Sequence, residues 1–238
     1  MLFKGSYNLL LWALLLLFIL RPYDRGIVYE GIWKFTLLAV LVGAIFNCNH
    51  SKTVQRLILA LAIPTWIFSW TNLLFVEELV FVLKAVTTIL FMLVCTSSII
   101  YDVLLRARVT IETLRGVICA YFMVAFAFAY MYCLIEYVSP GSIQLTNIQV
   151  TVGSFAHYLS EMLYFSFITL LTIGFGDIAP ASDVAQTATV IEGMIGQFYI
   201  AILVARLVSV YSFVSDKRLR SAFEKQRLVK GSKKSAVE

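Results

Sequence analysis

The residues with the clearest chemical potential form one short stretch, residues 172–177, which reads Thr-Ile-Gly-Phe-Gly-Asp. Glycine adopts positive φ without steric cost, so Gly174 and Gly176 allow successive residues to alternate in handedness. Such a strand can align its carbonyl oxygens along one axis, where they replace the water around a dehydrated cation. The hydroxyl of Thr172 would add an oxygen at the inner end, and the carboxylate of Asp177 would attract cations at the outer end.

This stretch resembles the selectivity filter of the potassium channel family, whose pattern is Thr-x-Gly-(Tyr/Phe)-Gly-Asp. The resemblance implies that K⁺ binds the carbonyl oxygens of Thr172, Ile173, Gly174 and Phe175 and the hydroxyl of Thr172. It also implies that Gly176 completes the turn outward and that Asp177 lies at the outer mouth. Phe175 replaces the commoner tyrosine and lacks the hydroxyl that can tie the filter to the pore helix, so looser selectivity is an alternative.

A short helix is predicted immediately before this stretch, over residues 158–171, because apolar residues recur there at helical spacing. Fourteen residues rise about 21 Å, roughly half to two thirds of a bilayer core, which is a re-entrant length. Its C-terminal dipole would favour a cation in the middle of the membrane. Tyr164 and Phe165 lie where relatives place an aromatic cuff, or they are ordinary packing residues. Ile168 stands where some relatives carry a buried glutamate.

The rest of the chain predicts an all-α integral membrane protein. The sequence is 61% hydrophobic, with a mean hydropathy of +0.88. Six transmembrane helices are predicted from predominantly apolar runs at residues 7–20, 33–47, 57–75, 79–101, 114–136 and 184–213. With the re-entrant pore helix and filter loop, four subunits would form the pore, because one filter strand supplies one side of the ion path. The first run is interpreted as an uncleaved anchor in preference to a signal peptide.

Three parts of the chain follow from this division. Residues 110–213 resemble the pore module of the family: outer helix, pore helix, filter and inner helix. Residues 1–109 resemble a four-helix voltage-sensor domain in number and position alone, because Lys84 stands where a sensor needs several arginines. Little or no voltage dependence is therefore expected. Residues 214–238 form a basic tail.

The distribution of charge predicts the topology. Basic residues cluster in the tail and in the connection between the fourth and fifth spans, which includes Arg106 and Arg108. The positive-inside rule therefore places both termini in the cytoplasm of a multi-pass protein of the cell membrane. Because the tail directly follows a span, it is expected to bind anionic lipid and not nucleic acid.

The predicted inner helix carries three further candidate residues. Gly196 and Gly193 are candidates for a gating hinge, since glycine weakens a helix, and close helix packing is the alternative. Glu192 is an ionisable group inside a span. It either raises the cation concentration in a pore cavity or serves as a packed, hydrogen-bonded carboxylic acid behind the filter.

The expected function is that of a homotetrameric, potassium-selective channel that conducts K⁺ passively. A weakly selective monovalent cation channel and a non-conducting modulatory subunit are the alternatives. An intramembrane enzyme is not expected, because the chain has two histidines and neither an HExxH nor a Gly-x-Ser-x-Gly motif. The four cysteines fit no metal site, so no cofactor is expected beyond the permeant K⁺. The sequence identifies no regulatory partner.

Overall fold

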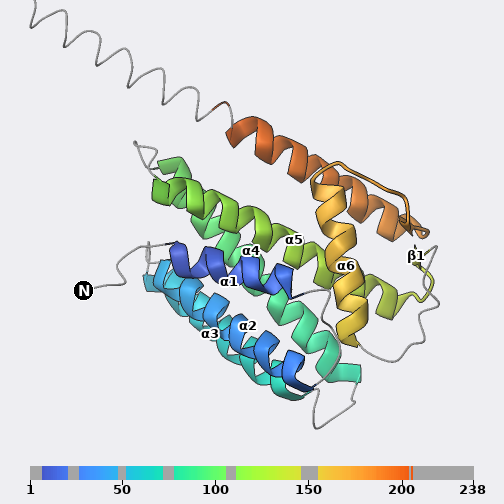
Figure 1. The fold of residues 1–238 in the computed structure, drawn as a ribbon, viewed down its shortest axis with the longest axis horizontal. Coiled ribbons are helices and arrows are strands. Elements are labelled where there is room, and N and C mark those ends of the chain that lie inside the picture. Colours follow the sequence, from blue (N-terminus) through green and yellow to red (C-terminus); the bar gives the residue numbers. More distant parts are fainter. Residues whose placement is uncertain are drawn as a thin grey trace, which may run out of the picture. The chain divides into compact units, whose positions relative to one another are not determined.

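The computed structural model describes residues 7–20, 27–47, 52–71, 78–105, 111–145, 155–203 and 205, and most of them are helical (Figure 1). The helices are α1 (Asn8–Ile19), α2 (Ile27–Asn47), α3 (Lys52–Thr71), α4 (Glu78–Leu105), α5 (Ile111–Val138) and α6 (Phe155–Leu170), followed by a helix over residues 183–203 that is called the last helix below. The chain divides into two compact units, residues 1–197 and 198–238, and the first contains helices α1 to α6 and both strands.

Three of the described helices are long and apolar enough to cross a membrane. They are α3, α4 and α5, with apolar stretches at Lys52–Trp70, Leu79–Val103 and Glu112–Val138. The apolar parts of α1 and α2 are shorter, Asn8–Ile19 and Gly31–Asn47. Six spans and a re-entrant helix therefore remain a prediction. The predicted sixth span extends to residue 213, and its part at 204 and 206–213 lies outside the described residues, as do the tail at 214–238 and the cluster at Arg106 and Arg108.

The core of the first unit is built around α5. This helix packs most extensively on α4 and also contacts α6 and α1, while α3 packs on α4 and α2. Its side chains at Met123, Phe126 and Tyr132 are almost completely buried, because neighbouring helices cover most of its circumference. The predicted boundary at residue 109 stays a prediction, since α1 and α4 both pack directly on α5.

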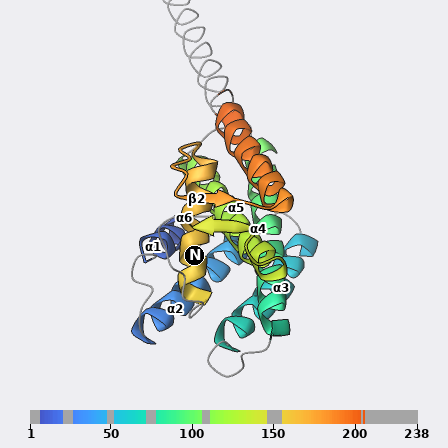
Figure 2. The same ribbon diagram turned by 90° about the vertical axis from the view of Figure 1, so that its right-hand side faces the viewer.

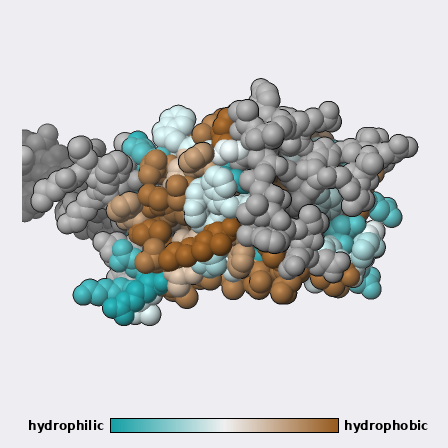
Figure 3. Space-filling view, turned by 90° about the horizontal axis from the view of Figure 1, so that it is seen from below, coloured by the Kyte–Doolittle hydropathy of each residue, from teal (hydrophilic) through white to brown (hydrophobic). Residues whose placement is uncertain are grey.

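Apolar side chains are also exposed in large number, as expected where lipid replaces water as the solvent. On the face drawn in Figure 3, hydrophobic residues predominate over the middle of the described surface and hydrophilic residues lie toward its two ends. Exposed apolar residues of α3 and α4 recur at helical spacing, at Leu59, Ile63, Ile67, Leu83, Val86, Leu90 and Leu93. This pattern is typical of helices with a lipid-facing side.

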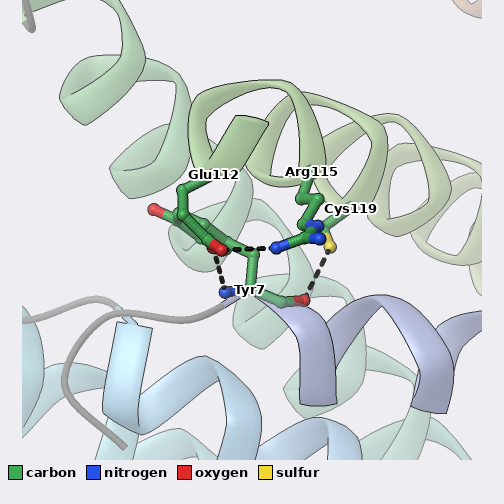
Figure 4. A network of polar contacts seen from close by, with 4 residues as sticks. All are labelled: Tyr7, Glu112, Arg115 and Cys119. Atoms are coloured by element: carbon green, nitrogen blue, oxygen red, sulfur yellow. Dashed lines mark hydrogen bonds and ion pairs between the residues drawn. The ribbon is translucent and has the colours of Figure 1, made fainter. Parts of the chain in front are cut away.

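The start of α1 is anchored on α5 by a network of polar contacts (Figure 4). The backbone N–H of Tyr7 donates to Glu112 Oε2 at 3.0 Å, and Arg115 forms an ion pair with the same carboxylate at 2.5 Å. The Tyr7 ring is buried, and a Cβ on Gly116 would lie 3.1 Å from it. The Cys119 thiol lies 3.9 Å from the Tyr7 carbonyl oxygen. The first helix therefore begins at a defined place on α5.

Two short strands were not predicted from the sequence. β1 (Ile143–Leu145) pairs antiparallel with β2 (Ile178–Pro180), with Leu145 opposite Ile178. Figure 2 shows the two strands as neighbouring arrows. β2 directly follows the candidate filter, so this pairing ties the segment after α5 to the segment after the filter.

Candidate functional site

The backbone of residues 172–176 alternates in handedness. Positive φ occurs at Thr172 (56°), Gly174 (56°) and Gly176 (78°), and not at the two residues between them. The alternation that the two glycines allow is therefore present, and it begins one residue pair earlier, at Thr172. Successive residues of opposite handedness turn their N–H groups to one side of the chain, which leaves the carbonyl oxygens for the other.

The end of α6 holds the start of this strand. The N–H groups of Ile173 and Gly174 both donate to the carbonyl oxygen of Ile168, at 2.8 and 3.3 Å. Thr172 closes a tighter turn, with its N–H on the carbonyl oxygen of Thr169 at 2.9 Å. The helix carbonyls that have no partner within α6 are thereby used to orient the strand. The backbone of Ile168 thus supports the strand, although its side chain cannot replace a glutamate.

All of residues 171–176 are exposed in the single chain. Phe175 is 69% exposed and Ile173 is 49% exposed, although both are large apolar residues. The rest of the described chain therefore leaves this segment uncovered.

The outer end of the strand is fastened to α6 and to its own backbone. Asp177 Oδ2 accepts a hydrogen bond of 2.8 Å from the hydroxyl of Tyr164, and Oδ1 accepts from the N–H of Ile178 at 3.1 Å. Both carboxylate oxygens therefore have partners. Tyr164 lies eight residues before Thr172 in the sequence, and its hydroxyl contacts Asp177, the residue that follows the strand.

A second carboxylate organises the segment that pairs with β2. Glu136, near the end of α5, accepts the N–H of Gly141 at 2.7 Å and the N–H of Ile143 at 2.9 Å, one on each oxygen. The carbonyl oxygen of Ser142 then accepts the N–H of Ala181 at 2.7 Å, just beyond β2. Glu136 thus shapes the turn that leads into β1, and through β1 it supports the exit of the strand.

On the inner side, Glu192 of the last helix is completely buried against α5 and α6. Its Oε2 accepts a hydrogen bond of 2.5 Å from the hydroxyl of Tyr132, and its Oε1 contacts the hydroxyl of Ser166. All three side chains are fully enclosed within this one chain. Glu192 thus lies against α6 and faces no open space in the single chain.

The two glycines of the last helix differ in their surroundings. A Cβ added to Gly196 would lie 2.4 Å from the carbonyl oxygen of Leu170, at the end of α6, whereas a Cβ on Gly193 would meet nothing within 4 Å. The hydroxyl of Tyr121 donates to the same Leu170 oxygen at 2.9 Å. Gly196 therefore occupies a position of close helix approach, and hinge bending at either glycine stays a prediction.

Four residues that support the site were not identified from the sequence as site residues: Tyr121, Tyr132, Glu136 and Ser166. Each is a polar side chain in or beside an apolar run, and such groups need partners. That signal alone marks them as unusual, but it does not say which partner they have.

Two comparisons with known proteins find similarity to channels. Residues 117–213 match the sequence model of a family described as ion channel. A segment of 74 residues is 34% identical to the two pore potassium channel c of Oryza sativa subsp. japonica. That segment is 31% of this chain and spans 16% of the length of the rice protein.

Residues 117–213 are accordingly similar to an ion-channel domain, in a chain with three helices long and apolar enough to cross a membrane among the described residues. The rice protein is named as a potassium channel, and the matched segment covers only a small part of its length.

Proposed function

We propose that this chain is one subunit of a potassium-selective channel that conducts K⁺ passively across the cell membrane. The observation that carries the proposal is the alternating backbone at Thr172, Gly174 and Gly176, held by Ile168 at one end and by Asp177 at the other. K⁺ would bind the carbonyl oxygens of residues 172–175 and the Thr172 hydroxyl. Gly176 would lead the chain outward to Asp177 at the mouth.

Four copies around one axis complete the site in this proposal. Support comes from the exposure of the whole strand in the single chain and from the one filter motif that the sequence contains. Four strands would surround a cation with oxygens on every side, as a carbonyl-lined filter requires. Cyclic symmetry supplies that arrangement from a single kind of chain.

The orientation proposed in the membrane has the mouth at Asp177 outside and both termini in the cytoplasm. It rests on the basic residues between α4 and α5 and in the tail, which also predict contact with anionic lipid. Glu112 and Arg115 would then lie near the cytoplasmic surface, and Glu136 near the outer one.

The test is cation flux through the purified protein in liposomes, with K⁺ inside and Na⁺ outside. A reversal potential near the K⁺ equilibrium potential is expected for the wild type. Gly174→Ala should abolish selective flux, since an alanine at φ 56° costs about 1–2 kcal/mol in each subunit. Gly141→Ala is the matched control, because Gly141 also has positive φ (84°) and open space for a Cβ but lies outside the filter.

Two other outcomes would redirect the proposal. A reversal potential near zero with robust flux would identify a weakly selective monovalent cation channel, which the missing hydroxyl at Phe175 favours. Absence of flux from a folded tetramer would indicate a modulatory subunit.

A further inference from the structure

Three oxygen–oxygen contacts meet where the last helix packs on α6 and α5, and the two hydroxyl groups involved supply only two hydrogens for them. Ser166 Oγ lies 2.9 Å from the carbonyl oxygen of Ala125 on α5 and also contacts Glu192 Oε1. Glu192 Oε2 lies 2.5 Å from the hydroxyl of Tyr132. No Lys or Arg of the described residues forms an ion pair or hydrogen bond with Glu192, so hydroxyls alone surround the carboxyl group.

Counting hydrogens decides which group donates to which. A carbonyl oxygen can only accept, so the contact between Ala125 and Ser166 uses the single hydrogen of the serine hydroxyl. The tyrosine hydrogen lies in the short contact with Glu192, because Thr189, at 3.4 Å from the Tyr132 hydroxyl, is farther away. Thr189 already donates to the carbonyl oxygen of Ala185 at 2.8 Å. The contact between Glu192 and Ser166 is then left without a hydrogen unless the carboxyl group supplies one.

We infer that Glu192 is a neutral carboxylic acid that donates its proton to Ser166. The donors then form one directed circuit. Tyr132 donates to Glu192, Glu192 donates to Ser166, and Ser166 donates to the carbonyl oxygen of Ala125, back on α5. The circuit begins and ends on α5 and passes through the last helix and α6. A chain of hydrogen bonds that all run in one direction polarises its members cooperatively, which favours a rigid arrangement at low dielectric.

This circuit makes Glu192 a positioning residue for the filter, a consequence that rests on the proposed function. Ser166 lies two residues before Ile168, whose carbonyl oxygen holds the N–H groups of Ile173 and Gly174. Hydrogen bonds that restrain Ser166 therefore also restrain the end of α6, from which the filter strand starts. Burial of the three side chains in a single chain places the circuit behind the filter and away from the ion path.

Infrared difference spectroscopy of the protein in lipid at neutral pH tests the inference directly. The wild type minus Glu192→Gln should show the C=O stretching band of a protonated carboxylic acid. Ser166→Ala removes the acceptor of that proton, so the band should move to higher frequency. Absence of the band, or a band that Ser166→Ala leaves in place, would overturn the inference. Glutamine keeps one donor and one acceptor, so this variant is expected to fold.

Flux then tests the positioning role. Glu192→Gln should conduct within about threefold of the wild type, whereas Glu192→Leu, which leaves Tyr132 and Ser166 without their partner, should lose about fivefold or more. Equal losses in the two variants would overturn the positioning role. The infrared band is measurable in a protein that passes no current, so failure of the proposed function and failure of this inference give different results.

Discussion

The hydroxyl of Tyr164, on α6 before the candidate filter, donates a hydrogen bond of 2.8 Å to Asp177, directly after the filter. The bond therefore fastens the residue that follows the strand to the helix that precedes it. Phe175, at the position where a hydroxyl is commoner in the family, cannot make a tie of this kind. In this chain Tyr164 of α6 supplies the hydroxyl, and the Asp177 carboxylate accepts its hydrogen bond.

Tyr164→Phe should weaken the outer end of the filter while leaving the fold intact. A hydrogen bond to a charged group contributes about 1.5–3 kcal/mol, and its loss frees Asp177 to move. We expect faster decay of the K⁺ current and a reversal potential shifted toward zero, both measured in planar bilayers. The control is Tyr158→Phe on the same helix, because the Tyr158 hydroxyl makes no hydrogen bond within the described part of the chain. Identical behaviour of the two variants would show that the tie is not needed.

Gly196→Ala should destabilise the channel domain. The new Cβ would lie 2.4 Å from the Leu170 carbonyl oxygen, so the last helix or α6 has to shift, at a cost of about 1–3 kcal/mol. Gly193→Ala meets no atom and should be neutral, or stabilising by up to about 1 kcal/mol through helix propensity. Thermal unfolding in detergent measures both. If Gly193→Ala reduces flux without changing the unfolding temperature, bending at that glycine matters for gating.

Glu136→Ala should loosen β1. Its carboxylate is the acceptor for the N–H groups of Gly141 and Ile143, and both lose this partner. Hydrogen exchange at the Ile143 amide should accelerate by about tenfold or more, given about 1.5–3 kcal/mol for a hydrogen bond to a charged group. Glu136→Gln keeps one acceptor oxygen, so its exchange rate at Ile143 should lie between those of the wild type and Glu136→Ala. Unchanged exchange in Glu136→Ala would mean that the pairing with β2 suffices to hold the strand.

Conductance should depend little on voltage. Lys84 in α4 and Lys34 in α2 are 8% and 6% exposed, and the Lys34 amine lies 5.1 Å from the centre of the Trp70 ring. One charge crossing the membrane yields about 2.3 kcal/mol per 100 mV, far less than an array of arginines supplies. A conductance–voltage curve recorded in symmetric K⁺ should be shallow, and Lys84→Gln should leave its slope unchanged. A steep curve would show that charges outside α4 move.

The sequence by itself determined the positions of most helices and the alternating backbone of residues 172–176, because both depend on residues close together in the chain. Apolar runs predicted α1, α3, α4 and α5 to within about five residues at most ends, and α2 begins six residues earlier than expected. The spacing of Gly174 and Gly176 predicted the alternating backbone, since glycine alone has a low cost at positive φ. The family resemblance rested on the same short motif, and the comparison with known ion channels supports it.

Tertiary structure alone decided which polar groups meet. Tyr132, Glu192 and Ser166 are separated by 60 and 26 residues, and Tyr7 and Glu112 by 105. A polar side chain in an apolar span must find a partner, but the sequence offers many partners and no distance between them. The pairing of β1 with β2 and the close approach of Gly196 to Leu170 likewise depend on how helices pack. Packing brings distant residues within hydrogen-bond range, and no local periodicity records that.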